Sequence, residues 1–489
     1  MLKTLLGIGG LQLATMVVML ARTKILAVFL GPGGVGLLGV VDKLLAVVVQ
    51  GVSLSLPFAA IRFLPELSQT DRSEGYRTLR SMALTLAALV FAAATTGAVV
   101  SLLFPAVWGP QFKAYPWLLA AGFLSIPALA FAPFIQNAFA GILQHRSAML
   151  FGLGHAGVLA LAGLIGAAAG SVAVLYLSYA ALAGIWLVPA MHRLIRALRP
   201  SPVPPLAGWR DVLPSRRILR FSAAMFLLAV LAPFAALNAH YQVLRQAGVE
   251  AAGWMQAAIG ISLAVRSVLG AAHPIYLTPQ LNKGGSWQER MRWAARFQHL
   301  WCILAAVLVP PLLIGADLAI AVLYSKSFLP ATQYVALFVF AEVLTMQAGI
   351  YQGLIVAADR IRFHVAQNLA SQVVFIAVSW LTIPRFGIAG AAFGAIASQA
   401  FIFVCTLSYL KVKMDLMPPL RITALMMYVL LGMGGLGWLG ADGLVLHGTG
   451  GATALAAFGA FLAGLSLFLT REDRDGFRTW TSRLVRRRQ

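Results

Sequence analysis

Charged residues are scarce in this chain, and acidic residues are the scarcest of them. Only 11% of its 489 residues are charged, with 15 Asp and Glu against 37 Lys and Arg, while 60% are hydrophobic. The apolar residues gather in runs of roughly 20–28, long enough for α-helices to cross a hydrocarbon core ~30 Å thick. The sequence therefore predicts an all-α polytopic membrane protein.

Cysteine and the usual enzyme signatures are also in short supply. The two cysteines, Cys302 and Cys405, both lie within predicted spans, which excludes a disulfide framework and a four-cysteine metal site. The sequence has no P-loop, no nucleophile elbow, no His-rich metal spacing and no pair of loop carboxylates suited to glycosyl transfer. We expect no enzyme activity, no cofactor and no bound metal. Any energy that the protein uses must therefore come from an ion gradient or from a difference in substrate concentration.

About fourteen candidate transmembrane helices lie between polar or Pro/Gly-rich breaks. They cover residues 5–30, 36–63, 79–104, 116–142, 148–169, 171–192, 219–245, 251–279, 298–323, 332–357, 363–383, 388–410, 421–440 and 450–470. An even number of spans places both termini on the same side of the membrane.

Basic residues distinguish the two sides. Most lie in or beside alternate breaks, whereas the opposite breaks carry only Lys113, Arg245, Lys326 and Arg385. Under the positive-inside rule the rich side, with both termini, is cytoplasmic. The net charge of +22 does not indicate nucleic acid, because no loop is long enough to form a basic soluble domain. It favours anionic lipids of the cytoplasmic leaflet as partners, especially for the basic tail 471–489.

Two lobes are indicated by a Pro-rich interruption and by matching helix ends. Leu64-Pro65-Glu66-Leu67 and Thr278-Pro279-Gln280-Leu281 are separated by the same offset as Arg146 and Arg360, which indicates a duplication. Because each repeat has six helices, the second repeat has the same orientation in the membrane as the first. The two lobes would then be parallel repeats about an axis along the membrane normal, with a substrate path between them. The predicted parts are an N-terminal lobe 1–198, a cytoplasmic linker 199–217, a C-terminal lobe 218–411, accessory helices thirteen and fourteen at 412–470, and the tail 471–489.

Four ionisable residues lie in the outer thirds of the first two spans: Arg22, Lys24, Asp42 and Lys43. Each costs ~2.5–3.5 kcal/mol at membrane depth and usually faces a cavity or a partner. Lys24 and Asp42 are equally distant from Gly33, so a structural Lys24–Asp42 salt bridge is one interpretation. Arg22 and Lys24 are about 200° apart around a helix, and both cannot point into one cavity.

Arg266 and Glu342 lie deep within the eighth and tenth spans. A central Arg266–Glu342 ion pair is the structural alternative. In the functional interpretation, the intramembrane cations neutralise an anionic substrate, and a diphosphate suits them because guanidinium donors match phosphate oxygens. Asp42 and Glu342 then become candidates for binding a coupling proton or sodium ion, since a carboxylate at low dielectric can alternate between charged and neutral states.

Five other polar residues have weaker claims. Arg62, at the inner end of the second span, is an entry-gate candidate or snorkels to the interface. His155 and His240 could titrate near neutral pH or form hydrogen bonds that pack helices. Gln136 and Asn137 are candidate polar residues of the cavity, although bridging between helices is the simpler role.

Three segments of the chain carry a resemblance to a known family. The first, 21–37, reads ARTKILAVFLGPGGVGL, and the others run from 253 to 281 and from 323 to 391. They resemble bacterial polysaccharide flippases of the multidrug/oligosaccharidyl-lipid/polysaccharide exporter superfamily, and the first is similar to that family's signature from first to second helix. Together they cover both lobes, and the chain looks most similar to flippases of the O-antigen and enterobacterial common antigen type.

This resemblance implies a flippase of the bacterial inner membrane that serves cell-surface polysaccharide synthesis. Its cargo would be an undecaprenyl-diphosphate-linked oligosaccharide, moved from the cytoplasmic to the periplasmic leaflet by alternating access. A proton or sodium ion would be the counter-ion, and polysaccharide polymerase machinery a partner. Arg22, Lys24 and Arg266 match the family's basic cavity residues, and Glu342 stands where relatives carry an acidic residue. Lys43 and Arg62 complete the candidate diphosphate-binding set.

Three rival functions remain open. A drug/cation antiporter of the same superfamily should carry acidic and aromatic cavity residues, whereas the cations within the spans here outnumber Asp42, Glu342 and Asp317. A peptidoglycan-precursor flippase shares the diphosphate and cannot be separated from the first proposal by charge. A scaffold for polysaccharide assembly that transports nothing would keep its function without Arg266.

Overall fold

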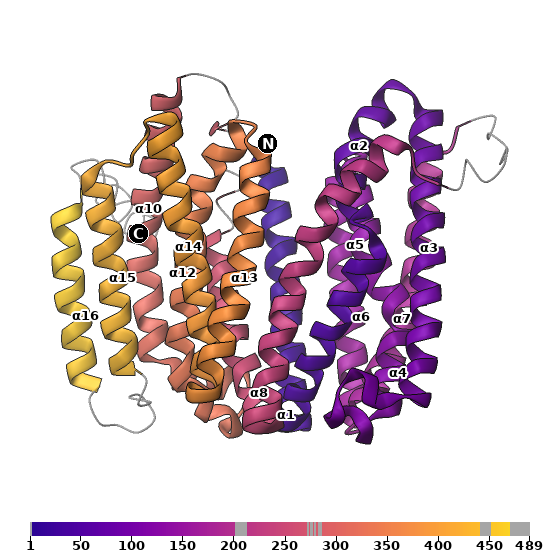
Figure 1. Cartoon of the computed structure of the whole chain (residues 1–489), viewed down its shortest axis with the longest axis horizontal. Helices are drawn as coiled ribbons and strands as arrows, with labels where there is room; N and C mark the ends of the chain where they lie inside the picture. Colours follow the sequence, from indigo (N-terminus) through magenta and orange to yellow (C-terminus); the bar gives the residue numbers. More distant parts are fainter. Residues whose placement is uncertain are drawn as a thin grey trace, which may run out of the picture. The chain divides into compact units, whose positions relative to one another are not determined.

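The computed structural model describes residues 2–200, 213–270, 273, 277, 280–281, 286–440 and 451–469. Every regular element within these residues is a helix (Figure 1), so the predicted all-α fold is confirmed. The basic tail and most of the predicted linker lie outside the described residues. The described residues form two compact units, of which unit 1 is 1–256, 322–328 and 383–388, and unit 2 is 257–321, 329–382 and 389–489.

The predicted spans are mainly helical within their described residues, but several are joined or divided differently from the prediction. The α-helices are α1 Leu2–Ser53, α2 Leu56–Thr70, α3 Arg72–Leu103, α4 Pro116–Leu124, α5 Ile126–Gly141, α6 His145–Ala168, α7 Val172–Leu198, α8 Arg216–Gly270, α10 Trp287–Ile314, α11 Ala316–Leu323, α12 Thr332–Ala357, α13 Ile361–Phe386, α14 Ile388–Met414, α15 Leu420–Gly440 and α16 Gly451–Leu465. Short 3-10 helices are η1 Pro105–Trp108, η2 Pro110–Ala114, η5 Lys326–Ala331 and η6 Ser466–Phe468.

Two glycine bends divide α1 and α8. Gly31 has φ 63° and Gly248 has φ 91°, and each interrupts an otherwise continuous helix. Such positive φ values place little strain on glycine but are unfavourable for residues with a side chain. The predicted breaks at 31–35 and 246–250 are therefore bends rather than loops.

Three other predicted spans each consist of two helices. The span 36–63 breaks between α1 and α2, where Leu54 and Ser55 have positive φ. The span 116–142 changes helix at Ser125, and 298–323 changes helix at Gly315. Proline in the first turn of α2 and of α5 explains two of these breaks, because a proline ring fits an N-terminal turn but blocks a continuous helix.

Eleven helical segments are long and apolar enough to span a membrane by length and composition. Two of these, Ala14–Ser53 and Arg216–Gly270, contain the glycine bends and are long enough for two passes, and α16 supplies a shorter apolar helix. The chain is thus a multi-pass membrane protein.

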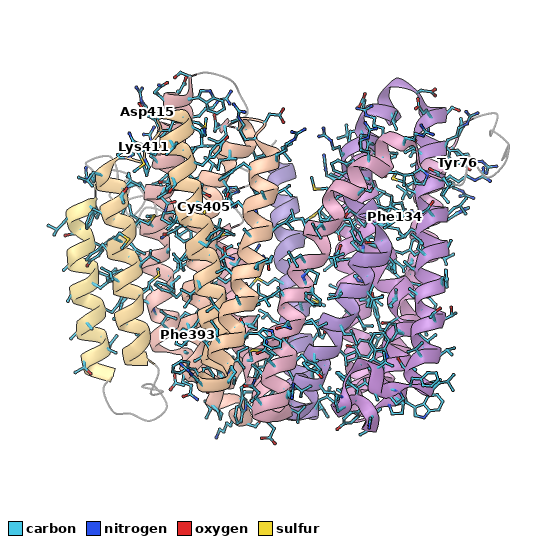
Figure 2. All side chains as sticks on the ribbon, in the orientation of Figure 1. Tyr76, Phe134, Phe393, Cys405, Lys411 and Asp415 are labelled. Carbon is cyan, nitrogen blue, oxygen red and sulfur yellow. The ribbon has the colours of Figure 1, made fainter. Side chains whose placement is uncertain are left out.

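Unit 1 is built around α4 and α5. Their segment Pro116–Gly141 has 72% of its most apolar window buried, the largest share of any candidate span among the described residues. Phe123, Phe134 and Tyr179 are almost fully buried there, and Figure 2 labels Phe134 on α5. The unit's polar residues are therefore held by a tightly packed apolar core.

In unit 2, α15 packs on α10 and α12, and α16 packs on α15. A side chain at Gly432 would overlap the Phe461 ring, and one at Gly464 would overlap Tyr428. The rings of Tyr428 and Phe461 stack with centroids 5.2 Å apart, and the Tyr428 hydroxyl donates to the Phe461 carbonyl at 2.6 Å. Small residues thus permit the close helix contact that the glycine-rich sequence suggests.

The end of α14 carries a surface ion pair. Lys411 Nζ lies 2.9 Å from Asp415 Oδ1 (Figure 2), and this hydrogen bond together with the positive charge lowers the pKa of Asp415. Both side chains are exposed, so the pair marks a helix end in water rather than a buried site.

The backbones of α1 and α8 are in direct contact where these two helices cross within unit 1. A Cβ atom at Gly253 would overlap the Pro32 carbonyl, and one at Gly36 would overlap the Val249 carbonyl. These contacts are immediately beside the two bends, so the bent segments approach as closely as helices can.

We expect Gly253→Ala to lower the thermal unfolding midpoint of the purified protein by several degrees. The new methyl group would force α1 away from α8, and overpacking of this kind typically costs about 1–3 kcal/mol. Gly51→Ala is the matched control, because a Cβ atom there meets nothing within 4 Å. Equal midpoints for the two variants would contradict the tight crossing.

Candidate functional site

A partly buried carboxylate lies in unit 1. The Tyr176 hydroxyl of α7 donates a hydrogen bond of 2.6 Å to Asp42 Oδ1 on α1. Tyr176 is only 2% exposed, and the positive charges of Arg22 and Lys43 also act on Asp42. A carboxylate in apolar surroundings needs such partners to remain charged.

The bend at Gly31 divides α1 into two arms, and the distance of each residue from the bend indicates which cation is level with Asp42 along these arms. Measured from Gly31, at 1.5 Å per residue, Arg22 lies about 14 Å and Asp42 about 17 Å along their helical segments. The Lys24–Asp42 pair rested on symmetry about Gly33, whereas the bend is at Gly31. Lys24 is half-buried on α1, and its pairing with Asp42 stays a prediction.

Arg22 fits against a glycine of α6. A Cβ atom at Gly163 would lie 3.1 Å from Arg22 Cγ, so the missing side chain makes room for the arginine stem. Arg22 Nε is buried and has no hydrogen-bond partner among the described residues. The guanidinium therefore keeps a donor that no described residue satisfies.

Lys43 and His240 lie near the α1–α8 crossing in unit 1. The charge of Lys43 acts on His240. His240 Nδ1 lies 2.9 Å from the Ala236 carbonyl oxygen and Nε2 lies 3.1 Å from Gln256 Oε1. A neutral ring that donates from Nδ1 satisfies both contacts only when the Gln256 amide is turned, so that its nitrogen replaces Oε1 opposite Nε2. His240 thus connects the two parts of α8 on either side of Gly248.

Gln136 and Asn137 on α5 contact neighbouring helices of unit 1. Asn137 Nδ2 donates to the Pro57 carbonyl at 3.2 Å, near the start of α2. The Gln136 amide lies against Gly152 of α6. Both contacts join helices, and neither residue is brought to the Asp42 cluster by an observed hydrogen bond.

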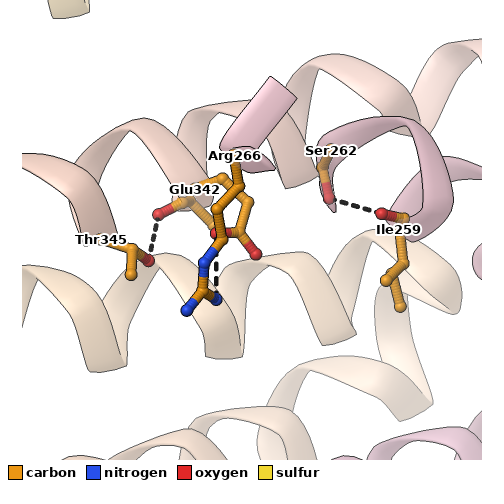
Figure 3. Close-up of polar contacts among 6 residues, drawn as sticks. Ile259, Ser262, Arg266, Glu342 and Thr345 are labelled. Carbon is orange, nitrogen blue, oxygen red and sulfur yellow. Dashed lines mark hydrogen bonds and ion pairs between the residues drawn. The ribbon is translucent and has the colours of Figure 1, made fainter. Parts of the chain in front are cut away.

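An ion pair joins α8, near its end at Gly270, to the middle of α12 in unit 2. Arg266 Nη1 on α8 is 3.6 Å from Glu342 Oε2 on α12 (Figure 3), with side chains 49% and 18% exposed. Glu342 is ten residues into the 26-residue α12, which places the pair about 15 Å from the helix start. The pairing that the sequence left as an alternative is present, but it is long and partly open.

Neighbouring hydroxyl groups do not compete for this pair. Thr345 donates to the Ala341 carbonyl at 2.9 Å, and Ser262 donates to the Ile259 carbonyl at 2.8 Å (Figure 3). Both bonds return to the residue's own helix, as is common for these side chains. The Arg266 side chain, which is 49% exposed, is accordingly open to a ligand.

Arg62 lies apart from the Asp42 cluster, on the exposed side of α2. Its guanidinium carbon is 5.8 Å from the centre of the Phe221 ring. The structure thus describes Arg22, Asp42 and Lys43 as one group in unit 1, Arg62 as a second, and Arg266 with Glu342 as a group in unit 2.

Two residues of the unit 1 cluster were missed from sequence. Tyr176 and Gly163 lie in apolar spans where tyrosine and glycine are ordinary residues. Only the packing of α6 and α7 against α1 shows that the Tyr176 hydroxyl binds Asp42 and that Gly163 leaves room for the Arg22 side chain.

This arrangement of helices matches known transporters. The chain aligns with a structure of "Lipid II flippase MurJ, inward closed conformation" at a TM-score of 0.71, with 10% identity, over 94% of this chain and 98% of that one. The chain shares that fold. An inward-facing MATE multidrug transporter matches at 0.54 with 15% identity (84% and 95% covered), and the MATE multidrug transporter DinF-BH matches at 0.53 with 14% (83% and 95%). No family model and no curated protein sequence matches the chain.

We expect Tyr176→Phe to destabilise the protein more than Tyr179→Phe does. Removing the hydroxyl leaves the Asp42 carboxylate without its hydrogen bond, and bonds to charged groups contribute about 1.5–3 kcal/mol. Tyr179 lies near His155 at 3.4 Å instead. Thermal unfolding of both variants in detergent provides the comparison. The Asp42→Asn/Tyr176→Phe double variant should lose less than the sum of the single variants, and strict additivity would argue against the contact.

Proposed function

We propose that this protein is a flippase for undecaprenyl-diphosphate-linked oligosaccharide in the bacterial inner membrane. It moves the lipid from the cytoplasmic to the periplasmic leaflet by alternating access, coupled to a proton or sodium gradient, for cell-surface polysaccharide synthesis. The partly open Arg266–Glu342 pair carries the proposal. The MurJ-like fold over 94% of the chain supports it.

The exposure of Arg266 argues for a polar ligand. A guanidinium facing lipid midway along a span is unfavourable by ~2.5–3.5 kcal/mol or more. Glu342 approaches only to 3.6 Å and leaves the Arg266 side chain 49% exposed. We infer that this exposed half faces water when the protein is empty and the diphosphate when substrate is bound.

Exchange of partners on Arg266 provides a route to ion coupling. Phosphate oxygens match the paired donors of a guanidinium better than a single distant carboxylate oxygen does. When the diphosphate binds Arg266, Glu342 loses its counter-charge and becomes a site for a proton or sodium ion. The two binding events are thereby linked in free energy, because occupancy of Arg266 favours occupancy of Glu342.

The unit 1 cluster supplies further positive charge in this proposal. Arg22 has a free buried donor, and the Tyr176 hydroxyl holds one oxygen of Asp42. Asp42 is then less able than a free carboxylate to neutralise Arg22, Lys24 and Lys43 together. The surplus cations replace the water that a diphosphate loses within ~30 Å of hydrocarbon.

A multidrug antiporter is the second candidate, because the fold also matches MATE transporters at a TM-score of 0.54. Organic cations would bind the carboxylates of Asp42 and Glu342 rather than the arginines. This alternative predicts that loss of Glu342 abolishes binding and that loss of Arg266 does not.

In proteoliposomes with a fluorescent undecaprenyl-diphosphate oligosaccharide, we expect Arg266→Gln to slow transbilayer movement about 10–100-fold, since a charge-assisted hydrogen bond contributes about 1.5–3 kcal/mol. Arg266→Lys should recover part of the rate because it restores the charge without the planar fork. Arg385→Gln, at an exposed helix end, is the matched loss of charge and should behave as wild type. Unchanged movement in Arg266→Gln would remove Arg266 from the site.

Glu342→Gln should uncouple movement from the gradient. Its neutral amide cannot exchange a proton, so an imposed pH or sodium gradient should accelerate wild type and leave the variant nearly unaffected. The ratio of rates with and without the gradient measures this effect. A variant that responds like wild type would assign coupling to another group.

A further inference from the structure

Four arginines and two phenylalanines of unit 1 surround an open cavity of about 510 Å³ where α2 meets the start of α8. The lining residues are Arg62, Phe63, Arg216, Arg217, Arg220 and Phe221. Only Arg62 among these was singled out from sequence. The cavity lies on the side of the chain that the positive-inside rule places in the cytoplasm.

Aromatic rings hold two of the guanidinium groups. Phe63 and Phe221 meet edge to face, with centroids 5.5 Å apart. The guanidinium carbon of Arg217 lies 5.2 Å from the Phe63 ring centre, and that of Arg62 lies 5.8 Å from the Phe221 ring centre. Each distance is within the range of cation–π attraction, so the two helices present these charges in a fixed arrangement.

The cavity floor is anchored in the core of the unit. Phe63 is 6% exposed, and Ile218, on the first turn of α8, is 2% exposed and belongs to the same hydrophobic cluster. The start of α8 therefore cannot drift from α2 without exposing apolar core. A site on this floor is preorganised, which lowers the entropy lost on binding.

Positive charge in the cavity exceeds its internal compensation. Glu66 accepts an ion pair from Arg217 at 3.4 Å. Among the described residues, Arg216 and Arg220 have no hydrogen bond or ion pair, and both are exposed. Within the part of the chain that the structure describes, four arginines line the cavity and Glu66 is the carboxylate paired with one of them. A multiply charged anion would match this surplus better than a singly charged phospholipid.

We propose that this cavity captures the diphosphate of the polyprenyl lipid from the cytoplasmic leaflet, before the lipid reaches Arg266. The inference rests on the proposed function for the identity of the lipid. Arginine forks suit the paired phosphoryl groups, and the position at a helix end leaves the prenyl chain in the membrane. Positive-inside topology requires basic residues on this side, but it does not require them to surround one cavity on a shared aromatic pair.

Binding of undecaprenyl diphosphate to the full-length protein in phosphatidylcholine nanodiscs tests the site. We expect R216Q/R217Q/R220Q to weaken binding at least tenfold. The control R193Q/R196Q/R199Q removes the same charge from exposed positions near the end of α7 and should stay within twofold of wild type. Equal weakening by both triple variants, or by neither, would overturn the capture site. Thermal unfolding midpoints identify any variant that has lost its fold, and R216K/R217K/R220K should bind with intermediate affinity.

Competition distinguishes the diphosphate from anionic lipid in general. Unlabelled undecaprenyl diphosphate should displace the bound probe, while a tenfold excess of phosphatidylglycerol should displace little of it. Equal displacement by the two lipids at equal charge would assign the cavity to ordinary phospholipid and overturn the proposal.

Flipping assays separate this inference from the proposed function. The Arg216/Arg217/Arg220 triple variant should need more lipid to reach half its maximal rate, yet keep the maximal rate of wild type. If wild type flips the lipid and the triple variant has an unchanged half-maximal concentration, the capture site is wrong and the function stands. If wild type binds the lipid in an arginine-dependent manner without flipping it, the site stands and the flippase is wrong.

Discussion

Exclusion of water along the helices is the constraint on which this structure depends. Backbone groups within hydrocarbon must bond inside their own helix, and every ionisable side chain must find a partner or an aqueous surface. Two of the intramembrane carboxylates, Asp42 and Glu342, meet this requirement differently. Asp42 is joined to a nearly buried tyrosine, whereas Glu342 contacts a half-exposed arginine. The first arrangement stabilises one charge state, and the second leaves its cation accessible.

The fold was predictable because a membrane restricts the choice of structure so strongly. Apolar runs of sufficient length must be helices, and Gly31-Pro32 and Gly248 interrupt them where the sequence indicated. The finer breaks were missed, since Leu54 and Ser55 adopt positive φ in a stretch whose apolar composition predicts a continuous span. Composition reports burial in lipid, but it does not report a local change of helix direction.

The candidate site was predictable only where a residue was unusual for its surroundings. Arg266 and Glu342 are rare at membrane depth, and their pairing followed from their similar positions in two spans. Tyr176 gives no such signal. It is 134 residues from Asp42 in the sequence, and the two residues meet only because α7 packs near α1. The arginines of α8 were accounted for by topology, so nothing in the sequence distinguished those that surround a cavity from those that only face water.

The crossing of α1 and α8 has a mechanical consequence. Gly36 and Gly253 bring main chain against main chain, so at these two positions no side chain has to change rotamer when the crossing angle changes. The crossing can therefore serve as a pivot. A change in crossing angle displaces the glycines little and displaces residues farther along each helix more. Arg22 and Asp42, about 14 and 17 Å from the Gly31 bend, lie far enough along α1 to be carried by such a rotation.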